Sequence, residues 1–214
     1  MNHDTLIRNE TPADYETVEA ITREAFWNLY VPGCNEHYLA HILRGHEDFI
    51  PELDLVVEAD HHVIGNIMYT KTMLIDEAGL EKPILTFGPV SILPQYQRCG
   101  YGKKLMEASF ERAIQLGYDV IVIFGNPDNY VSRGFKSCQK FNISLEDGVF
   151  PAAMMAKELK PGVLDGRRWV YRQSAAFELD EQAAQRFDDS LPPKVKSVQP
   201  SQEEFYIHSH AIMR

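Results

Sequence analysis

The sequence predicts an α/β protein with a mixed β-sheet flanked by helices. Residues 120–124 are an unbroken apolar run, which is typical of a parallel strand buried on both faces. A strand-like segment at 84–93 precedes them, and a glycine-containing turn and a helix-like segment lie between, which is the order of a βαβ unit. Residues 55–59 and 63–69 are joined by only three residues, so they predict an antiparallel hairpin. Parallel and antiparallel pairs together indicate a mixed sheet.

The composition is that of a globular chain with one core. The chain has 214 residues, 44% hydrophobic and 24% charged, and a net charge of −10, which argues against a nucleic-acid partner. No apolar run is long enough to span a bilayer, and the N-terminus does not have the pattern of a secretory signal. Cys34, Cys99 and Cys138 are widely spaced, so neither a disulfide framework nor a zinc site is expected. We therefore expect a cytoplasmic protein without a metal or a membrane partner.

The N-terminal part predicts a short strand at 6–8 and then two helices. Residues 11–14 (Thr-Pro-Ala-Asp) are a helix start, because they supply a capping residue, a proline at the first helical position and an acid that bonds back. Apolar residues then recur at helical spacing, and this helix is expected to end near 30–33. Asn35 is placed to cap a second helix.

The middle of the chain predicts a long hairpin and the βαβ unit. The strand that begins at residue 63 continues to 75, and the chain turns and returns over 82–93. Gly88 and Pro89 lie inside the returning strand, where they predict a bulge that frees main-chain N–H groups. A helix is expected over about 100–116, with Gly117 as its C-terminal cap.

The remaining third predicts shorter elements. Asn126 is placed to cap a short helix that Pro127 opens, and Gly134 to end it. Three further elements are expected: strands at 169–173 and 205–208, and a helix at 181–187. Residues 153–159 are ambiguous, because their methionine and alanine residues favour a helix although a strand is also possible. We divide the chain into a domain at 1–160 and a C-terminal extension at 161–214. The extension either packs on the domain or crosses to a second copy in a homodimer, and both arrangements stay open.

The turn at 97–103 predicts an anion site. Gly100 and Gly102 carry no Cβ, so an anion can approach the main chain closely, and Arg98 and Lys103 add positive charge. The helix that follows presents unpaired first-turn N–H groups and the positive end of its dipole. The string lacks the spacing of a Walker loop, and Leu105 stands where a dinucleotide fingerprint needs its third glycine. A tight turn without a ligand, and a site for another nucleotide, stay open on the glycines alone.

Two longer strings resemble one family. Gln97-Arg98-Cys99-Gly100-Tyr101-Gly102 is similar to the Gln/Arg-x-x-Gly-x-Gly/Ala motif of the GCN5-related N-acetyltransferases, and Pro94-Gln95-Tyr96 resembles the lead-in to that motif, with Gln95 in place of an acid. Downstream, residues 130–135 (Tyr-Val-Ser-Arg-Gly-Phe) resemble the Tyr-x-x-x-Gly-Phe ending of the same family. The resemblance covers roughly residues 5–160 and implies the acyl-CoA N-acyltransferase fold, whose order of elements implies a strand at 153–159.

The resemblance also implies a site. Acetyl-CoA would be the acetyl donor, with Tyr130 as the acid that protonates the leaving thiolate. The residues implied to bind the cofactor are Val90, Ile92, Gln97, Arg98, Cys99, Gly100, Tyr101, Gly102, Lys103 and Asn126. The residues implied to line the acceptor pocket are Trp27, Tyr30, Glu36 and His37, for which core packing is the competing interpretation.

The function predicted from this resemblance is N-acetyl transfer to the primary amine of a small molecule or peptide, by direct attack in a ternary complex. Cys99 is not expected to act as a nucleophile, because the family transfers the acetyl group without an acyl-enzyme. The general base is left unassigned. The alternative is a coenzyme A-binding regulatory or sensor module without catalysis.

Overall fold

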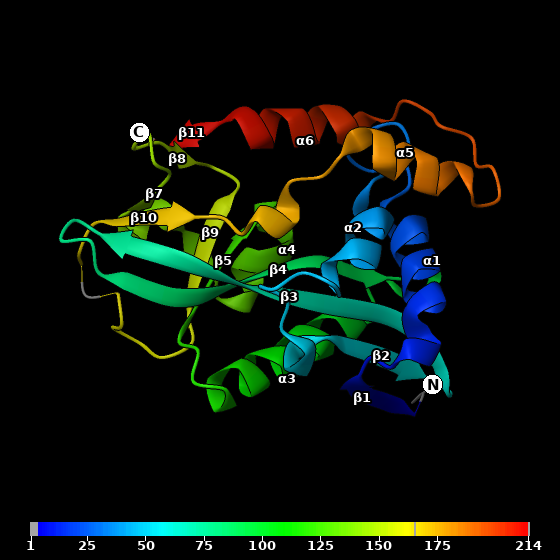
Figure 1. Ribbon diagram of the computed structural model, residues 1–214, viewed down its shortest axis with the longest axis horizontal. Helices are drawn as coiled ribbons and strands as arrows, with labels where there is room; N and C mark the ends of the chain where they lie inside the picture. Colours follow the sequence, from blue (N-terminus) through cyan, green and yellow to red (C-terminus); the bar gives the residue numbers. More distant parts are fainter. Residues whose placement is uncertain (1–3, 165, 214) are drawn as a thin grey trace.

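The computed structural model describes residues 4–164 and 166–213, and in them a nine-stranded mixed sheet forms the centre of the molecule (Figure 1). The strand order is β1-β2-β3-β4-β5-β9-β6, and β10 pairs with both β3 and β7. The strands of this sheet are β1 (Thr5–Asn9), β2 (Leu55–Ala59), β3 (His62–Asp76), β4 (Glu81–Ile92), β5 (Val120–Phe124), β6 (Lys136–Ser137), β7 (Ile143–Ser144), β9 (Met154–Glu158) and β10 (Trp169–Arg172). The predicted mixed α/β fold is confirmed.

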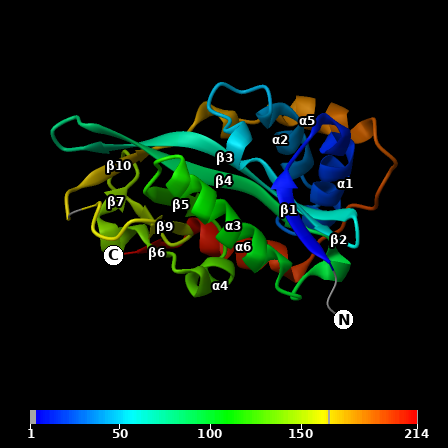
Figure 2. The same cartoon turned by 90° about the horizontal axis from the view of Figure 1, so that it is seen from below.

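Helices cover both faces of the sheet. They are α1 (Tyr15–Phe26), α2 (Glu36–Leu43), α3 (Tyr101–Gln115), α4 (Pro127–Tyr130), α5 (Glu181–Asp189) and α6 (Pro200–His210). Strand side chains alternate between the faces: Ile67 and Tyr69 join the apolar core that includes Leu105 of α3, while Met68 between them packs with Leu39 and Leu43 of α2. Figure 2 shows α3 on the near face and α1 with α2 beyond the sheet.

The N-terminal elements follow the prediction except at the end of α1. Thr11 and Asp14 form the expected capping box ahead of α1. The helix ends at Phe26, earlier than expected, because Asn28 adopts a left-handed φ of 59°. The side chain of Asn28 then holds the following loop by accepting a hydrogen bond from the Gly33 N–H at 2.8 Å.

The βαβ unit is confirmed. Strands β4 and β5 are parallel, and α3 connects them. Gly117 ends the helix at a φ of 90°, and the neighbouring Leu116 is exposed because it lies past the last turn. The bulge at Gly88 and Pro89 is also present: Ile67 pairs with Val90 and Tyr69 with Phe87, so two residues of β4 oppose one of β3.

The C-terminal segment corrects one prediction. Strands are found at β9 and β10 and a helix at α5, as expected, but residues 205–208 lie within helix α6 and not in a strand. Pro200 at the first helical position and the helix formers Gln202, Glu203 and Glu204 outweigh the β-propensity of the aromatic residues that follow. A short strand, β11 (Ile212–Met213), comes after α6 and pairs with β8 (Phe150–Pro151) in a second, two-stranded sheet.

The extension contacts the rest of the molecule. Strand β10 lies in the central sheet beside β3, and α5 packs against α2. The division at residue 160 stays a prediction. No helix in the described part of the chain is long and apolar enough to cross a membrane.

Candidate active site

Strands β4 and β5 part soon after they meet. The two strands pair only at Leu85 and Ile121, whereas β5 pairs along its whole length with β9 on its other side. Beyond the pairing point β4 runs on to Ile92 without β5 beside it. A cavity of about 580 Å³ lies there. Its lining comes from α1 and its following loop (Ala25, Phe26, Leu29, Tyr30), from β4 (Val90, Ile92), from the turn before α3 (Tyr96, Gln97, Arg98, Gly100), from α3 (Gly102, Lys103, Met106) and from the α4 region (Asp128, Asn129, Tyr130, Ser132, Arg133).

The main chain of β4 points into the gap at two residues. The Leu93 N–H donates to the Ile64 carbonyl of β3 at 2.8 Å. Because main-chain groups alternate in direction along a strand, those of Ile92 and Val90 point away from β3, toward the side that β5 has left. Main-chain donors on this edge are therefore available to a ligand in the cavity.

The turn between β4 and α3 is held in an unusual backbone conformation. Arg98 has a φ of 60° and Gly100, at the N-cap of α3, a φ of 89°. The Gln97 side-chain amide donates to the Ile92 carbonyl at 2.9 Å and so ties the turn to the end of β4. The first-turn N–H groups of α3 face the cavity end of the turn, where Arg98 and Lys103 place two exposed cations. This arrangement favours an anion.

Arg133 adds a third cation that the sequence reasoning missed. It lines the cavity, and its buried Nε has no hydrogen-bond partner among the described residues. A buried guanidinium nitrogen without a partner is costly unless a ligand or water satisfies it. The only sequence signal was its place inside the motif at 130–135.

Tyr130 lies between two phenylalanines at the end of α4. Its ring centroid is 5.8 Å from that of Phe87 and 5.8 Å from that of Phe135. Burial, and secondarily the neighbouring Tyr30 hydroxyl, raise the pKa of Tyr130 above its ordinary value. Tyr130 lines the cavity, and its hydroxyl has no hydrogen-bond partner in the part of the chain that the structure describes.

Three of the predicted cofactor residues, Cys99, Tyr101 and Asn126, lie beside the cavity and not in its lining. Asn126 uses its side-chain oxygen to cap α4, accepting from the Asp128 N–H at 3.0 Å. Cys99 is exposed, with its thiol 3.4 Å from the Gln97 carbonyl oxygen, and Tyr101 is buried against Tyr96 beneath the turn. These three shape the turn or the short helix around the cavity.

An acidic group lies near the α1 end of the cavity. Tyr30 lines that end, and burial together with the charge of Glu36 raises the pKa of Tyr30. Glu36 begins α2, and its carboxylate accepts a hydrogen bond from the Asn35 N–H at 3.0 Å. Burial raises the pKa of Glu36 as well. The two residues place a phenol at the α1 end of the cavity and a carboxyl group close to it.

The structure does not bring Trp27 and His37 to this cavity. The Trp27 indole donates to the Val195 carbonyl at 2.9 Å, under the C-terminal segment. His37 is completely buried, with Nε2 3.2 Å from Asp188 Oδ1 of α5 and outside hydrogen-bond alignment. Burial is the largest influence on His37 and lowers its pKa, although the charge of Asp188 acts in the opposite direction. Arg23, which pairs with that carboxylate at 2.8 Å, lowers the pKa of His37 further by its charge. Both residues fasten the extension to α1 and α2.

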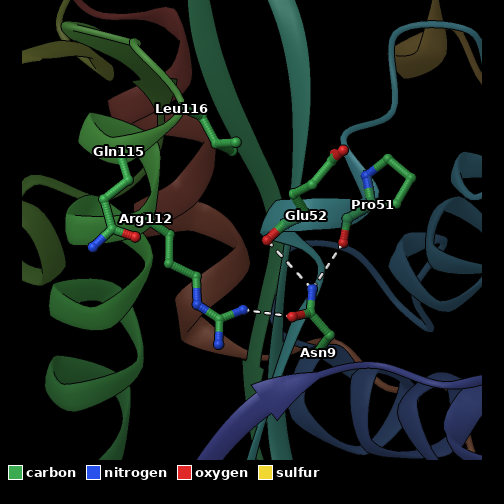
Figure 3. Close-up of a pocket in the computed structure, with 6 residues that line it drawn as sticks. All are labelled: Asn9, Pro51, Glu52, Arg112, Gln115 and Leu116. Carbon is green, nitrogen blue, oxygen red and sulfur yellow. Dashed lines mark hydrogen bonds between the residues drawn. The ribbon is translucent and has the colours of Figure 1, made fainter.

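A second hollow of about 500 Å³ lies between β1, the turn at Pro51–Leu53 and α3, away from the gap (Figure 3). Two of its polar side chains, Asn9 and Arg112, are already paired. Arg112 Nη1 donates to Asn9 Oδ1 at 2.6 Å, and Asn9 Nδ2 donates to the Pro51 and Glu52 carbonyls at 3.0 and 3.3 Å. In residues 4–164 and 166–213 no cluster of three or more His, Cys, Asp or Glu side chains is arranged to hold a metal ion.

The fold and the gap thus define a protein of the mixed α/β class in which a parallel strand pair opens over an anion-binding turn. A sequence profile of the acetyltransferase (GNAT) family matches residues 20–138, more than half of the chain. The chain belongs to this family, as its two motifs predicted.

Relatives and solved structures agree with the family. The chain is 28% identical over 132 residues to the uncharacterized N-acetyltransferase YhbS of Escherichia coli K12, covering 61% of this chain and 73% of YhbS. It is 25% identical over 89 residues to the uncharacterized N-acetyltransferase YjhQ of the same strain, and there the match spans 41% of this chain and about half, 48%, of the relative.

Two solved structures have a similar fold. The structure of Escherichia coli YhbS in complex with CoA has a TM-score of 0.71 at 21% identity and covers 84% of this chain and 94% of its own. A GNAT family acetyltransferase from Brucella melitensis in complex with acetyl-CoA has a TM-score of 0.64 at 25% identity, covering 82% of this chain and 99% of its own.

Proposed function

We propose that the protein transfers the acetyl group of acetyl-CoA to a primary amine by direct attack in a ternary complex. The observation that carries this proposal is that one cavity is lined by the turn before α3, by Val90 and Ile92 of β4 and by Tyr130. These are the three parts that the reaction needs: a holder for the diphosphate, donors for the carbonyl and an acid for the thiolate. The CoA-bound relatives described above support the choice of donor.

Different residues of the chain would bind different parts of acetyl-CoA. The first-turn N–H groups of α3, with Arg98 and Lys103, would receive the pyrophosphate. Arg133 offers its partnerless Nε to a further polar oxygen. The main-chain groups of Val90 and Ile92 would hold the pantetheine arm as an added strand edge.

The acetyl transfer uses Val90 and Tyr130. The amine nitrogen attacks the thioester carbonyl carbon, and the Val90 N–H stabilises the negative charge that develops on the oxygen. The C–N bond forms, the C–S bond breaks, and the sulfur takes the Tyr130 proton. The tyrosinate then regains a proton from the product nitrogen or from water, which leaves an amide and a free thiol. The raised pKa of Tyr130 keeps its proton in place at neutral pH.

Two measurements test this function. Calorimetry should show that the chain binds acetyl-CoA and prefers coenzyme A to ATP and NAD. Thiol release over a panel of small amines, amino acids and peptides should show turnover, which Tyr130→Phe lowers by about 10²-fold while the dissociation constant of acetyl-CoA stays within about twofold. Tight binding without turnover on any acceptor would instead identify a coenzyme A-binding module, and a preference for ATP or NAD would contradict the proposal.

A further inference from the structure

Helix α6 spans the face of the molecule opposite α3. In Figure 1 it runs along the top from the α5 side to β8. At its start, Ser201 Oγ donates to the Leu29 carbonyl at 2.8 Å and Gln202 Nε2 to the Asn28 carbonyl at 3.0 Å. At its end, β11 pairs with β8, and the Ala152 N–H donates to the Ala211 carbonyl at 2.8 Å. The helix is thus fastened at both ends.

The middle of α6 contacts one residue of the cavity wall. The Phe205 ring stacks on Tyr30 with 4.4 Å between centroids, and Tyr30 with Leu29 forms the α1-side lining of the cavity. The described lining contains Tyr30 but no residue of α6, so α6 reaches the cavity through its contact with Tyr30.

Helix α6 is not a core helix. None of its residues is buried, and Phe205, Tyr206 and Ile207 are 38%, 58% and 57% exposed. A helix without a buried apolar face is held by what it bridges and not by what it covers. The half-buried residues, Ser201, Gln202, His208 and Ser209, fall on the side toward the rest of the molecule. The helix therefore has the properties of a strap between the loop after α1 and strand β8.

We propose that α6 roofs the acceptor end of the cavity, so that the enzyme accepts small primary amines with an aromatic or apolar body and excludes amines carried on folded proteins. This inference rests on the proposed acetyl transfer. Phe26, Tyr30 and Tyr130 line the cavity and supply aromatic surface for such a body, Phe205 supports Tyr30 by stacking on it, and Glu36 attracts the ammonium group. A lysine on a folded protein must reach past a helix about 10 Å across, which its four-carbon stem does not do.

The first test of whether α6 covers the cavity does not depend on acetyl-transfer activity. Ala25 lines the α1 end of the cavity, so Ala25→Cys in a Cys99→Ser background reports on access; Cys34 and Cys138 are buried. The probes are N-ethylmaleimide and a maleimide on a polyethylene-glycol chain of several kilodaltons. The measured quantity is the ratio of the reaction rates of the small and the large reagent at one thiol. The ratio at exposed Cys99 of the wild type is the reference for an open site. We expect the large reagent to be slowed by about tenfold more at the thiol introduced by Ala25→Cys than at Cys99. Equal ratios at the two positions would overturn the roof.

Two variants remove the roof in different ways. One is a chain ending at Gln199, which lacks α6 and β11, and the other is Phe205→Ala, which keeps the chain length. In the shortened chain the Ala25→Cys ratio should fall to that of Cys99, provided that circular dichroism and acetyl-CoA affinity match the full chain. If shortening alters the fold, the ratio in Phe205→Ala decides: an intermediate ratio supports the roof, and an unchanged ratio contradicts the contact with Tyr30.

Acceptor choice is tested with the full chain. We expect turnover of 2-phenylethylamine and none of the lysines of intact serum albumin, and a KM for 2-phenylethylamine raised about tenfold in Phe205→Ala. Faster acetylation of albumin than of the small amine would overturn the substrate class. Absence of turnover on every amine contradicts the acetyl transfer instead, and the maleimide ratio still decides whether α6 closes the cavity.

Discussion

Gly125→Ala should displace Tyr130 without touching the binding site of the donor. A Cβ at Gly125 would lie 2.5 Å from Cε2 of the Tyr130 ring, 3.3 Å from Cδ2 and 3.5 Å from Cζ. The backbone of Gly125 is not in the left-handed region, so alanine brings no conformational strain of its own. The ring has little room to retreat, because Phe87 and Phe135 are packed against it at 5.8 Å between centroids. Gly125 does not line the cavity.

The size of the effect follows from that contact. Carbon atoms come no closer than about 3.5 Å without repulsion, so the ring edge must move by about 1 Å. A displacement of about 1 Å in a reacting group costs roughly 10²-fold in rate, or about 2.7 kcal/mol of activation free energy. We expect kcat, measured by thiol release at saturating donor and acceptor, to fall by about this factor. The dissociation constant of acetyl-CoA, measured by calorimetry, should stay within about twofold.

A double-mutant cycle distinguishes displacement of the hydroxyl from general damage. In a Tyr130→Phe background the proton donor is already gone, so adding Gly125→Ala should lower kcat by no more than about threefold further. Gly45→Ala is the matched control, because its new Cβ would meet only the Ile42 carbonyl oxygen at 3.7 Å. Wild-type kcat in Gly125→Ala, or an equal loss in both backgrounds, would refute the assignment of Tyr130 as the acid.

Gly100→Asp should weaken acetyl-CoA binding by more than about 10²-fold in calorimetry with an unchanged circular dichroism spectrum, because it puts a side chain at a φ of 89° and a negative charge at the start of α3. Arg133→Met should raise the dissociation constant of acetyl-CoA by about tenfold, and an unchanged constant would show that Nε has no role in binding. The pKa of His37 is lower in the folded chain than in the unfolded chain. As the pH falls below about 6.5, the unfolded chain is therefore protonated at this residue before the folded chain is. The free energy of unfolding falls over this range by at most about 1.4 kcal/mol per pH unit. His37→Gln, compared with wild type by urea unfolding near pH 7 and pH 5, should lack this part of the slope; parallel slopes would contradict it.

Local signals were enough to predict the βαβ unit and its turn. The buried run at β5, the glycines before α3 and the capping residues Thr11 and Asn126 each act over a few residues, and the structure places each element within a few residues of its prediction. The bulge at Gly88 and Pro89 was predicted for the same reason, since neither residue supports a regular strand. The gap between β4 and β5 follows from this unit and its bulge.

Long-range contacts decided what the sequence could not show. Trp27 and Tyr30 are both aromatic and three residues apart, and helical spacing places them side by side. The left-handed conformation of Asn28 breaks that spacing. The Trp27 indole then donates a hydrogen bond to the Val195 carbonyl of the extension, whereas Tyr30 lines the cavity. His37 lies next to Asp188, a residue 151 positions further along the chain, and not at the cavity. Such pairings leave no trace in local periodicity, and neither does a partnerless Nε on Arg133.

The gap between β4 and β5 is maintained by packing as well as by missing hydrogen bonds. Two parallel strands that meet at Leu85 and Ile121 would gain further pairs by closing along their length. Phe87, Tyr130 and Phe135 prevent this, because their rings form a triangle with centroids 5.8 to 6.0 Å apart just past the pairing point, and Phe87 and Phe135 are buried. Closing the strands would expel this aromatic cluster and lose its burial, roughly 1.5–3 kcal/mol for each side chain. The same cluster that keeps the cavity open thus fixes the ring of the proposed acid, so the position of Tyr130 and the width of the gap depend on one set of contacts.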